Sequence, residues 1–394
     1  MRIGIASSIN VSILKPFIKV NCVVEKLDRL TYRRQTPAVD TLILSLLKEG
    51  HFLRIFTSGL EDFVYSCENF ELIVIKQSNN YVVRNTWGAF HLSQRIKKVV
   101  EKKCDDLDVI HAHWTYEYPY ALRTVSKNKP VICTVRDWAP YIWKFVSLKN
   151  KFMWTFNLLM AKLVYSNKNI HFVANSIYTA QLLKKNLGID APIIPNSIKD
   201  NFFEDVNRTK VDKHSILCIS SSDDKRKNII SLLRAFRTIK INYDDAKLIL
   251  VGGCFHIDSE TVKKYLRDNL LDGVVLAGFV KHEDLKGYID NAEVFVTPSL
   301  EETFGNTLLE AISRKVPTVG GLYSGAVPYV LHHGDAGYLC DVSDPDDIAR
   351  SIDYIFKNTK EVEIKCNNAY NIVKSEYSET EVTCKYINLY KSYC

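Results

Sequence analysis

The segment from Thr297 to Tyr329 carries the densest set of residues with chemical potential. Two carboxylates, Glu302 and Glu310, stand on either side of Gly305, and a helix is expected to begin at Asn306, so that Asn306 and Glu310 share a face. The first amides of such a helix can bind a phosphate, and glycine permits close approach. A carboxylate accepts from two neighbouring hydroxyls of a ribose or hexose. The segment therefore offers the three contacts that a nucleoside diphosphate sugar requires.

Short apolar runs alternate with helical patterns along the chain, which predicts parallel sheets of the α/β class. Helical patterns include Thr41–Lys48, which follows Pro37, together with Ile229–Thr238 and Leu308–Arg314. We expect more strands than one sheet usually holds. The expected strands are Ile3–Ala6, Leu53–Thr57, Leu72–Ile75, Val109–His113, Val131–Val135, Ile170–Ala174, Ile193–Ile194, Ile216–Ile219, Lys247–Val251, Val274–Leu276, Val294–Val296, Thr318–Val319 and Gly337–Leu339.

The polar stretch 196–212 has no clear period and precedes a new apolar strand. We therefore predict a linker there, between two doubly wound, Rossmann-like domains at 1–195 and 213–365, with a C-terminal helical segment at 366–394. Ligands bind beyond the carboxyl ends of the strands in open α/β sheets. The cleft between two such domains is the expected site.

Glu302–Gly305 and Leu309–Ala311 resemble the E-x7-E signature of the family 4 retaining glycosyltransferases of the GT-B fold. The resemblance covers nearly the whole chain and implies two Rossmann-like domains that face a central cleft, with a C-terminal helix (379–393) that crosses back over it. Further matching segments are Pro298–Ser299, Gly325–Pro328, Leu248–Gly253, Leu276–Val280, Lys48–Thr57, Asp108–Tyr118 and Ile193–Ile198.

The resemblance implies a role for each matching residue. Glu302 would bind hydroxyls of the transferred sugar, and Glu310 would bind the ribose of the nucleotide. Backbone groups of Phe304–Thr307 would meet the sugar and the diphosphate. Lys227 matches the family lysine that stabilises the leaving diphosphate. Contacts to the nucleobase are expected from the backbone near Phe279 and Val280.

The chain departs from the family pattern at three places. The family arginine after the first strand of the second domain falls on Ser221 or Ser222, so Arg226 or the serine hydroxyls would take its place at the phosphate. Arg136 stands where the family commonly has a histidine, and would hold donor phosphate or an acidic acceptor. Arg33–Pro37 replaces the family's Gly-Gly loop, which leaves the acceptor contacts open.

His111 and His113 end an expected strand and share one face of it. They are either substrate-binding residues at the cleft or core histidines with internal partners. Asp106-Leu107-Asp108 spells the DxD motif of metal-dependent glycosyltransferases, but it precedes a strand rather than ending one. We therefore expect no metal and no cofactor beyond the nucleotide sugar as co-substrate.

Composition excludes several classes of protein. Hydrophobic residues make up 46% and charged residues 25% of the chain, as in globular proteins. No apolar run is long enough to span a membrane, and the first residues fit a buried strand better than a signal peptide. The ten cysteines are scattered, without disulfide or zinc spacing, which predicts reduced thiols in a cytoplasmic protein. No Gly-x-Gly-x-x-Gly follows the first strand, which argues against a nicotinamide dehydrogenase.

Positive charge is concentrated in the first half of the chain. Residues 1–200 hold 28 Lys and Arg against 16 Asp and Glu, whereas residues 201–394 hold 24 against 29. From Trp138 to Ile189 there are seven lysines, no Asp or Glu, and interleaved aromatic residues. Such a stretch fits an anionic membrane surface, and the alternative is a pair of core helices with lysine-rich solvent faces. No nucleic-acid-binding module is present in the sequence.

The function implied by the resemblance is a retaining, metal-independent glycosyltransferase. It would move a sugar from a nucleotide diphosphate sugar to a lipid-linked or growing surface glycan, in polysaccharide, O-antigen or capsule biosynthesis, at the inner face of the cytoplasmic membrane. One alternative is a non-catalytic nucleotide-sugar-binding GT-B protein, suggested by the departures at Ser221, Ser222 and Arg136. The other is a GT-B nucleotide-sugar 2-epimerase, which would use carboxylates as acid and base. The sugar, nucleobase, acceptor and oligomeric state stay open.

Overall fold

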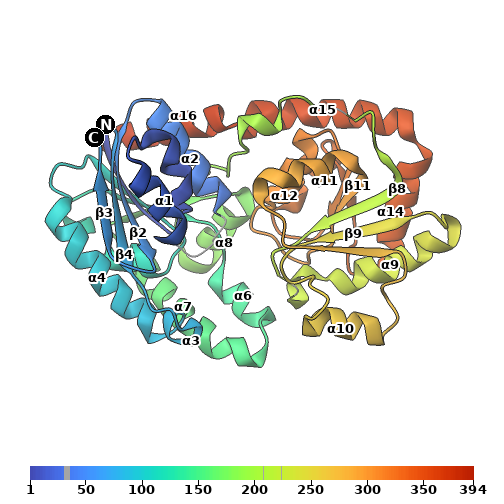
Figure 1. Cartoon of the computed structure of the whole chain (residues 1–394), viewed down its shortest axis with the longest axis horizontal. Helices are drawn as coiled ribbons and strands as arrows, with labels where there is room; N and C mark the ends of the chain where they lie inside the picture. The colour runs from blue at the N-terminus through green and yellow to red at the C-terminus, as the bar shows by residue number, and fades with distance from the viewer. Residues whose placement is uncertain (31–35, 207, 223) are drawn as a thin grey trace. The chain divides into compact units, whose positions relative to one another are not determined.

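The structure, a computed structural model, describes residues 1–30, 36–206, 208–222 and 224–394. Most of the segment Arg33–Pro37, where the family has its Gly-Gly loop, therefore lies outside the described residues. The chain forms two compact units (Figure 1). The first contains Met1–Ser197 and Glu379–Cys394, and the second contains Ile198–Ser378.

A seven-stranded sheet forms the centre of the first unit, in the order β3-β4-β2-β1-β5-β6-β7. All neighbouring strands are parallel except β3 and β4, which pair antiparallel. β5 and β6 are buried throughout, as expected for central strands of a parallel sheet with both faces covered. The strands are β1 (Arg2–Ala6), β2 (Phe52–Gly59), β3 (Phe63–Ser66), β4 (Phe70–Lys76), β5 (Val109–His113), β6 (Val131–Val135) and β7 (Ile170–Ala174).

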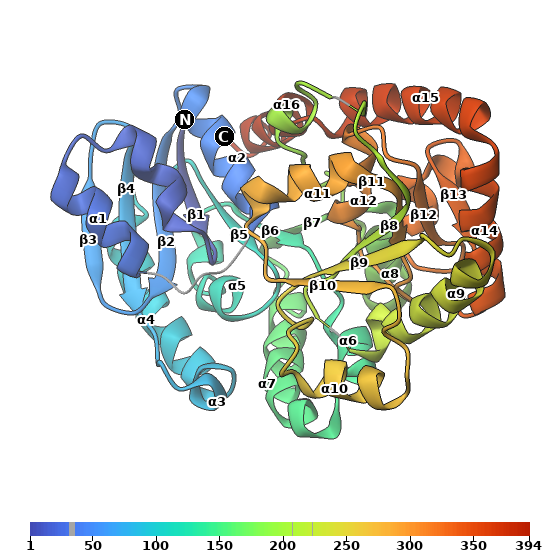
Figure 2. The same cartoon turned by 45° about the vertical axis from the view of Figure 1, so that its right-hand side comes forward.

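Helices cover this sheet, and the last one comes from the far end of the chain. α16 (Glu379–Lys391) packs against α2 (Pro37–Lys48), which contains the predicted helical pattern Thr41–Lys48 (Figure 2). Tyr386 and Tyr390 of α16 are buried in the same core as Ile3, Leu42 and Val109. The other helices of the unit are α1 (Asn21–Leu30), α3 (Tyr81–Arg84), α4 (Trp87–Lys103), α5 (Glu117–Ala121), α6 (Ala139–Phe145), α7 (Leu148–Tyr165) and α8 (Ile177–Leu187).

The second unit is built on a six-stranded parallel sheet, in the order β10-β9-β8-β11-β12-β13. Its strands are β8 (Asp212–Ile219), β9 (Lys247–Val251), β10 (Val274–Gly278), β11 (Ala292–Thr297), β12 (Thr318–Gly321) and β13 (Tyr338–Cys340). Its helices are α9 (Ile229–Asn242), α10 (Glu260–Arg267), α11 (Leu285–Asn291), α12 (Asn306–Ser313), α13 (Val327–Val330), α14 (Pro345–Lys357) and α15 (Thr359–Tyr377).

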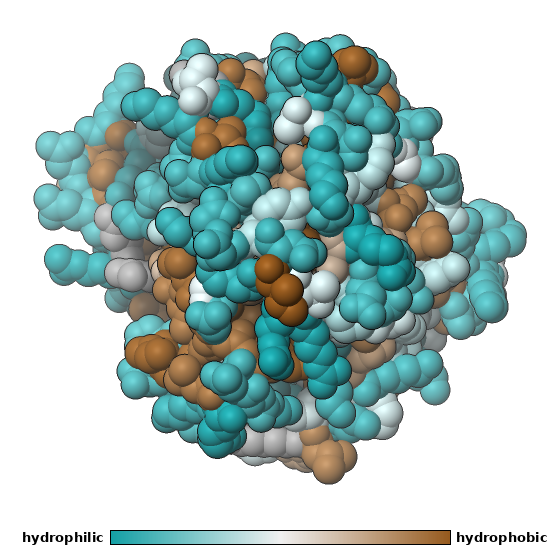
Figure 3. Space-filling model, turned by 90° about the vertical axis from the view of Figure 1, so that its right-hand side faces the viewer, coloured by the Kyte–Doolittle hydropathy of each residue, from teal (hydrophilic) through white to brown (hydrophobic). Residues whose placement is uncertain are grey.

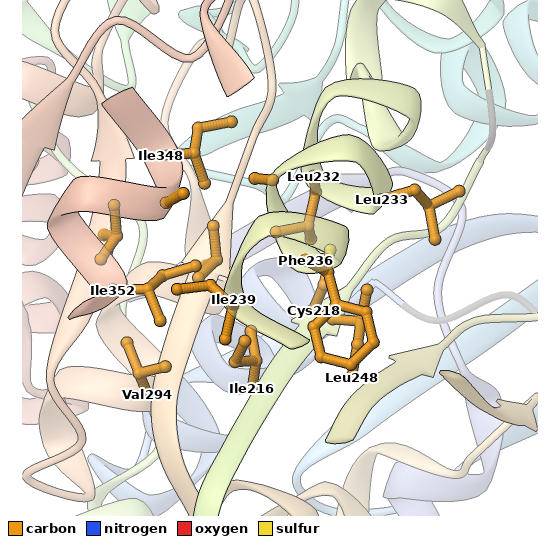
Figure 4. Close-up of a cluster of buried hydrophobic side chains, with 14 of the residues drawn as sticks. Ile216, Cys218, Leu232, Leu233, Phe236, Ile239, Leu248, Val294, Ile348 and Ile352 are labelled. Atoms are coloured by element: carbon orange, nitrogen blue, oxygen red, sulfur yellow. The ribbon is translucent and has the colours of Figure 1, made fainter. Parts of the chain in front are cut away.

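Amphipathic helices close the core of the second unit. Figure 4 shows one cluster, in which Phe236 and Ile239 of α9 and Ile352 of α14 pack with Ile216 and Val294 of the sheet. The opposite faces of these helices meet solvent, and Figure 3 shows that hydrophilic residues cover most of the surface on the side of α14. The helical period in the sequence thus sets which side of each helix is buried.

Both sheets have a switch point, where the strand order reverses. In the second unit the chain runs outward from β8 through β9 to β10, then returns to the other side of β8 and continues from β11 through β12 to β13. The loops that follow β8 and β11 are therefore neighbours at the carboxyl edge of the sheet, the usual ligand-binding place in such folds. In the first unit the corresponding neighbours are β1 and β5.

One strand prediction was wrong, and one strand was missed. Ile193–Ile194 forms no strand, because Ile193 makes a single bridge with Ala174 just after Pro192. The edge strand β3 was missed, since its FVYS sequence is short and only half-buried.

The segment 196–212, predicted as a linker, includes Phe202 and Phe203, which are buried in the core of the second unit. Within 366–394, α15 belongs to the second unit and α16 to the first.

Candidate functional site

Two cations and two carboxylates meet at the switch point of the second sheet. Arg226 and Lys227 lie in the turn after β8, and Glu301 and Glu302 lie in the loop after β11. Lys227 Nζ is 2.5 Å from Glu302 Oε1, and Arg226 Nη1 is 3.8 Å from Glu301 Oε2 and 4.0 Å from Glu302 Oε2. The side chains of Lys227 and Glu302 are 14% and 15% exposed. The residues that the sequence assigned to sugar and diphosphate are therefore in direct contact.

Main-chain bonds fix both sides of this contact. Leu300 N donates to Arg226 O at 2.7 Å, which joins the two loops, and Asp224 Oδ1 accepts from Arg226 N at 3.0 Å. Glu302 is bracketed by the turn after β12: its N–H donates to Ser324 O, and its carbonyl accepts from Ala326 N at 2.8 Å. The loop that carries Glu302 is thus held by backbone hydrogen bonds to the turn after β8 and to the turn after β12.

The charges set the protonation of Glu302. Burial alone raises the pKa of this carboxyl group, but Lys227 and Arg226 outweigh burial and lower its pKa below 4.5. Glu302 is therefore a carboxylate at neutral pH, able to accept hydrogen bonds from sugar hydroxyls.

The helix expected after Gly305 is present and begins at Asn306 as predicted. Gly305 has φ of +96°, and a Cβ atom here would lie 2.8 Å from Leu308 Cδ1, so both conformation and space favour glycine. The first turn of α12, with the backbone of Asn306 and Thr307, therefore begins directly after this glycine. Phe304 is buried at 4% exposed and packs edge-on against Tyr377.

Glu310 lies one turn into α12 and is 4% exposed. Its Oε1 is 2.8 Å from Nε2 of His282, in the turn that follows β10. Its Oε2 is buried without a hydrogen-bond donor among the described residues. This carboxylate is anchored through one oxygen and leaves the other as an acceptor.

The remaining predicted residues of the second unit occupy the same edge. Ser222 Oγ donates to Asp224 Oδ2 at 2.8 Å, so this hydroxyl supports the turn that carries Arg226, whereas Ser221 is exposed. Phe279, 57% exposed, and Val280 follow β10 directly. The Ser222 hydroxyl thus supports the turn, whereas Arg226 Nη1 lies 4.0 Å from the Glu302 carboxylate.

His111, His113 and Arg136 belong to the first unit. Both histidines are fully buried, and both ring nitrogens of His111 have partners at 2.7 Å, Tyr390 OH and Thr134 Oγ1. Burial, reinforced by the nearby Arg136 charge, lowers the pKa of His111 well below 6.5. His111 thus has the contacts of a core histidine with internal partners, the second possibility that the sequence left open.

His113 lies at the carboxyl end of β5 and contacts Arg136, which follows β6. Arg136 Nε donates to His113 Nδ1 at 3.2 Å, and Arg136 Nη1 donates to Asn196 Oδ1. Burial and the neighbouring charge lower the pKa of His113, so its ring is neutral, with the proton on Nε2. Arg136 is 9% exposed and its guanidinium is held in one orientation.

The DxD residues lie at the amino end of β5. Asp106 binds Arg2 and Arg54, and Asp108 Oδ2 accepts from Arg2 N at 2.7 Å. Both carboxylates therefore have structural partners. No group of three or more potential metal ligands occurs in the parts of the chain that the structure describes.

Comparison with known protein families finds two matches, which together cover most of the chain. Residues 200–372 match the model of glycosyl transferases group 1, and residues 38–202 match the model of glycosyltransferase family 4. The chain belongs to the family 4 glycosyltransferases. The predicted GT-B fold is confirmed, since the two parallel-sheet, Rossmann-like units have GT-B enzymes as structural neighbours.

Curated relatives of this glycosyltransferase include enzymes from bacteria. It is 24% identical over 364 residues to the N-acetyl-alpha-D-glucosaminyl L-malate synthase of Bacillus anthracis, with 88% of this chain and 90% of the relative covered. It is 26% identical over 170 residues to the capsular polysaccharide biosynthesis glycosyltransferase CapM of Staphylococcus aureus, with 43% and 44% covered.

Solved structures share the fold of the glycosyltransferase at low identity. Sucrose-phosphate synthase of Thermosynechococcus elongatus matches with a TM-score of 0.78 and 17% identity, over 100% of this chain and 98% of that chain. Anabaena HepE, solved in complex with UDP-glucose, matches with a TM-score of 0.68 and 16% identity, over 100% of both chains.

Sequence reasoning missed two residues of the site. Glu301 precedes the expected carboxylate and is 2% exposed beside Arg226, and its sequence signal was the doubled Glu301-Glu302. His282 contacts Glu310 across 28 residues of chain, and no local pattern announces that contact.

Proposed function

We propose that this glycosyltransferase transfers a sugar with retention of configuration, from a nucleotide diphosphate sugar to a lipid-linked or growing surface glycan. The observation that carries the proposal is the contact between Lys227 and Glu302 at the carboxyl edge of one sheet, with Glu310 in the helix that follows the same loop. Acceptors for two sugar diols and a cation for the diphosphate are what such a donor needs.

Each residue has one task in this proposal. Glu302 accepts hydrogen bonds from hydroxyls of the transferred sugar, and Glu310 accepts from the ribose. Lys227, with Arg226 beside it, stabilises the negative charge that grows on the diphosphate as the glycosidic bond breaks. The backbone amides at the start of α12 add donors for the phosphates. The acceptor hydroxyl then forms the new bond to the anomeric carbon on the face where the bond to the diphosphate breaks, and its proton passes to the leaving diphosphate, with no metal and no enzymic nucleophile.

Arg136 is proposed to act on the donor phosphate or on an acidic acceptor. Its guanidinium is held by His113 and Asn196 in one orientation, which suits binding of an anion through paired N–H groups. The name of the Bacillus anthracis relative gives its product as N-acetyl-alpha-D-glucosaminyl L-malate, and the acidic malate part of this product supports an anionic group on the acceptor side.

Nucleotide binding is the first test of the proposal. Thermal unfolding is measured with UDP, GDP, ADP and CMP, each with and without EDTA. A ligand present at about 100 times its Kd adds about 2.7 kcal/mol of stability. We expect one nucleoside diphosphate to raise the Tm equally with and without EDTA, and Glu310→Gln to remove most of that increase. No increase with any nucleotide would contradict the proposal.

A second measurement separates transfer from binding alone. With the nucleotide known, turnover of the corresponding UDP-, GDP- or ADP-sugars is followed by release of the nucleoside diphosphate. We expect turnover to fall about 100-fold or more in Glu302→Gln, because its hydroxyl contacts then lose their charged acceptor. Binding without any turnover over a panel of sugars and lipid acceptors would favour the non-catalytic alternative.

An anionic membrane surface is the proposed location of the enzyme. Exposed apolar side chains lie on neighbouring helices of the first unit: Trp87 at the start of α4 and Phe152 on α7 are each 57% exposed, and Leu148 is 85% exposed. Phe156 joins them, because its ring contacts both Phe152 and Phe90 of α4. We call Trp87, Leu148 and Phe152 the α4–α7 surface.

Charge favours lipid as the partner of the α4–α7 surface. Lys144 and Lys162 are exposed, and both lie in the stretch from Trp138 to Ile189, which contains no Asp or Glu. Each lysine near an anionic leaflet adds on the order of 1 kcal/mol to binding. None of the described helices combines the length and hydropathy of a membrane-spanning segment.

Vesicle sedimentation tests this location. We expect binding to phosphatidylcholine vesicles that contain phosphatidylglycerol and weak binding to phosphatidylcholine alone. Trp87→Ser with Phe152→Ser is expected to reduce binding about tenfold or more, whereas Ile241→Ser, at an even more exposed apolar residue of α9, leaves it unchanged. Equal binding of both variants would contradict the assigned surface.

A further inference from the structure

His282 and Glu310 come from different elements of the second unit and meet side chain to side chain. His282 begins the 3-10 turn His282–Asp284 after β10, whereas Glu310 lies in α12, after β11. Nε2 of His282 lies 2.8 Å from Oε1 of Glu310. Because a carboxylate only accepts, the imidazole proton of this bond is on Nε2.

The two oxygens of Glu310 are in different situations. Oε1 has the bond from His282, while Oε2 is buried and no donor from the described residues reaches it. A buried acceptor without a donor is unfavourable in a folded protein. A hydroxyl group of a ligand at this position would supply the missing donor.

Packing holds the imidazole of His282 in place. Its ring lies against the ring of Phe202, with centroids 5.4 Å apart and planes at 45°, and its side chain is 18% exposed. Phe202 is itself 2% exposed in the core of the second unit. The direction from which His282 approaches Glu310 is therefore set by a core residue.

We propose that His282 is a positioning residue for the nucleotide ribose. The inference rests on the proposed function, in which Glu310 accepts from the ribose hydroxyls. The bond to Oε1 fixes the rotation of the carboxylate group, so that Oε2 and the remaining lone pair of Oε1 face the two hydroxyls together. Without this bond the carboxylate rotates, and ribose binding must order it.

The experiment compares ribose with deoxyribose on the full-length protein. Calorimetry measures the Kd of UDP, GDP and ADP and of their 2′-deoxy counterparts, for wild type, His282→Ala and His282→Gln. We expect wild type to prefer the ribonucleotide, and His282→Ala to bind it roughly tenfold more weakly, while the 2′-deoxynucleotide, which keeps only the 3′ hydroxyl, loses clearly less affinity. His282→Gln keeps an N–H donor and is expected to restore the preference. The KM for the donor rises in His282→Ala while kcat changes little.

The control is a similar pair elsewhere in the same unit. His214 Nδ1 lies 2.7 Å from Asp245 Oδ1 near the start of β8, at the amino edge of the sheet. His214→Ala is expected to leave the ratio of the two dissociation constants unchanged. If His282→Ala does not fold, His282→Phe keeps a ring beside Phe202 without an N–H and takes its place.

Two results would overturn the inference, and they differ. If wild type prefers the ribonucleotide and the histidine variants weaken both nucleotides by the same factor, His282 has only a structural role and the proposed function stands. If wild type binds none of the nucleoside diphosphates, the proposed function fails and the inference fails with it.

Discussion

Lys227 Nζ lies 2.5 Å from Glu302 Oε1, although 75 residues separate the two in the chain. The turn after β8 and the loop after β11 bring them together because these strands are neighbours in the sheet. Without ligand, the proposed diphosphate cation and the proposed sugar acceptor neutralise each other. Donor binding therefore has to exchange this contact for contacts with phosphate and with hydroxyls.

Replacing the lysine tests its role at the diphosphate. Lys227→Met keeps much of the side chain's bulk and leaves Arg226 Nη1 at 4.0 Å from Glu302 Oε2. We expect turnover to fall about 100-fold or more, because charge on the leaving diphosphate loses its main partner. Steady-state kinetics measures this, with thermal unfolding as the check on folding. Unchanged kcat would show that Arg226 or backbone amides suffice.

Replacing the carboxylate has a different expected result. Glu302→Gln releases Lys227 from its ion pair, so the lysine is available to a nucleoside diphosphate without first breaking a contact. We expect the diphosphate that gives the largest thermal shift to bind several-fold more tightly, and the intact donor sugar to gain less, because its hydroxyls lose a charged acceptor. Calorimetry with both ligands measures the two effects. Weaker binding of the free diphosphate would rule out competition between Glu302 and phosphate for Lys227.

Asp106 gives the first unit an acid-sensitive contact. The hydrogen bond from Arg54, together with Arg2, lowers the pKa of Asp106 from 3.8 to about 2. The carboxylate of Asp106 therefore binds a proton more tightly in the unfolded chain than in the folded one. Its ionised form stabilises the folded state fully above about pH 4, and this stabilisation is lost as the pH falls towards 2. We expect the Tm difference between wild type and Asp106→Asn to shrink over that interval. Asp105→Asn removes the same charge one residue away, and an equal pH dependence there would contradict the assignment.

Tyr390 closes the core of the first unit from the C-terminal helix. Its hydroxyl is the partner of His111 Nδ1 at 2.7 Å, and both residues are fully buried. Tyr390→Phe leaves that nitrogen without its partner, so we expect the free energy of unfolding to fall by about 1–3 kcal/mol. Urea unfolding measures this, with Tyr393→Phe, a partly exposed tyrosine of the same segment, as the control. Equal stability of Tyr390→Phe and wild type would mean that another group replaces the hydroxyl.

Local patterns were enough to predict much of the fold. Alternating apolar and helical segments indicated two parallel sheets, and the turn at Gly305 with a helix start at Asn306 was read from residue type alone. These features depend on neighbouring residues, whose period and conformational limits are written in the sequence. Where the local signal was weak, as in the half-buried edge strand β3, the prediction failed.

The sequence by itself predicted which residues would bind a nucleotide sugar: Glu302, Glu310, Lys227 and the glycine before the helix. Only the tertiary structure decided their partners. Lys227 meets Glu302 because β8 and β11 are adjacent, and His282 meets Glu310 from the loop after β10. Arg136 is oriented by His113 and Asn196, and His111 by Tyr390. Such pairs depend on strand order and helix packing, which bring distant parts of the chain together and leave no periodic signal in either part.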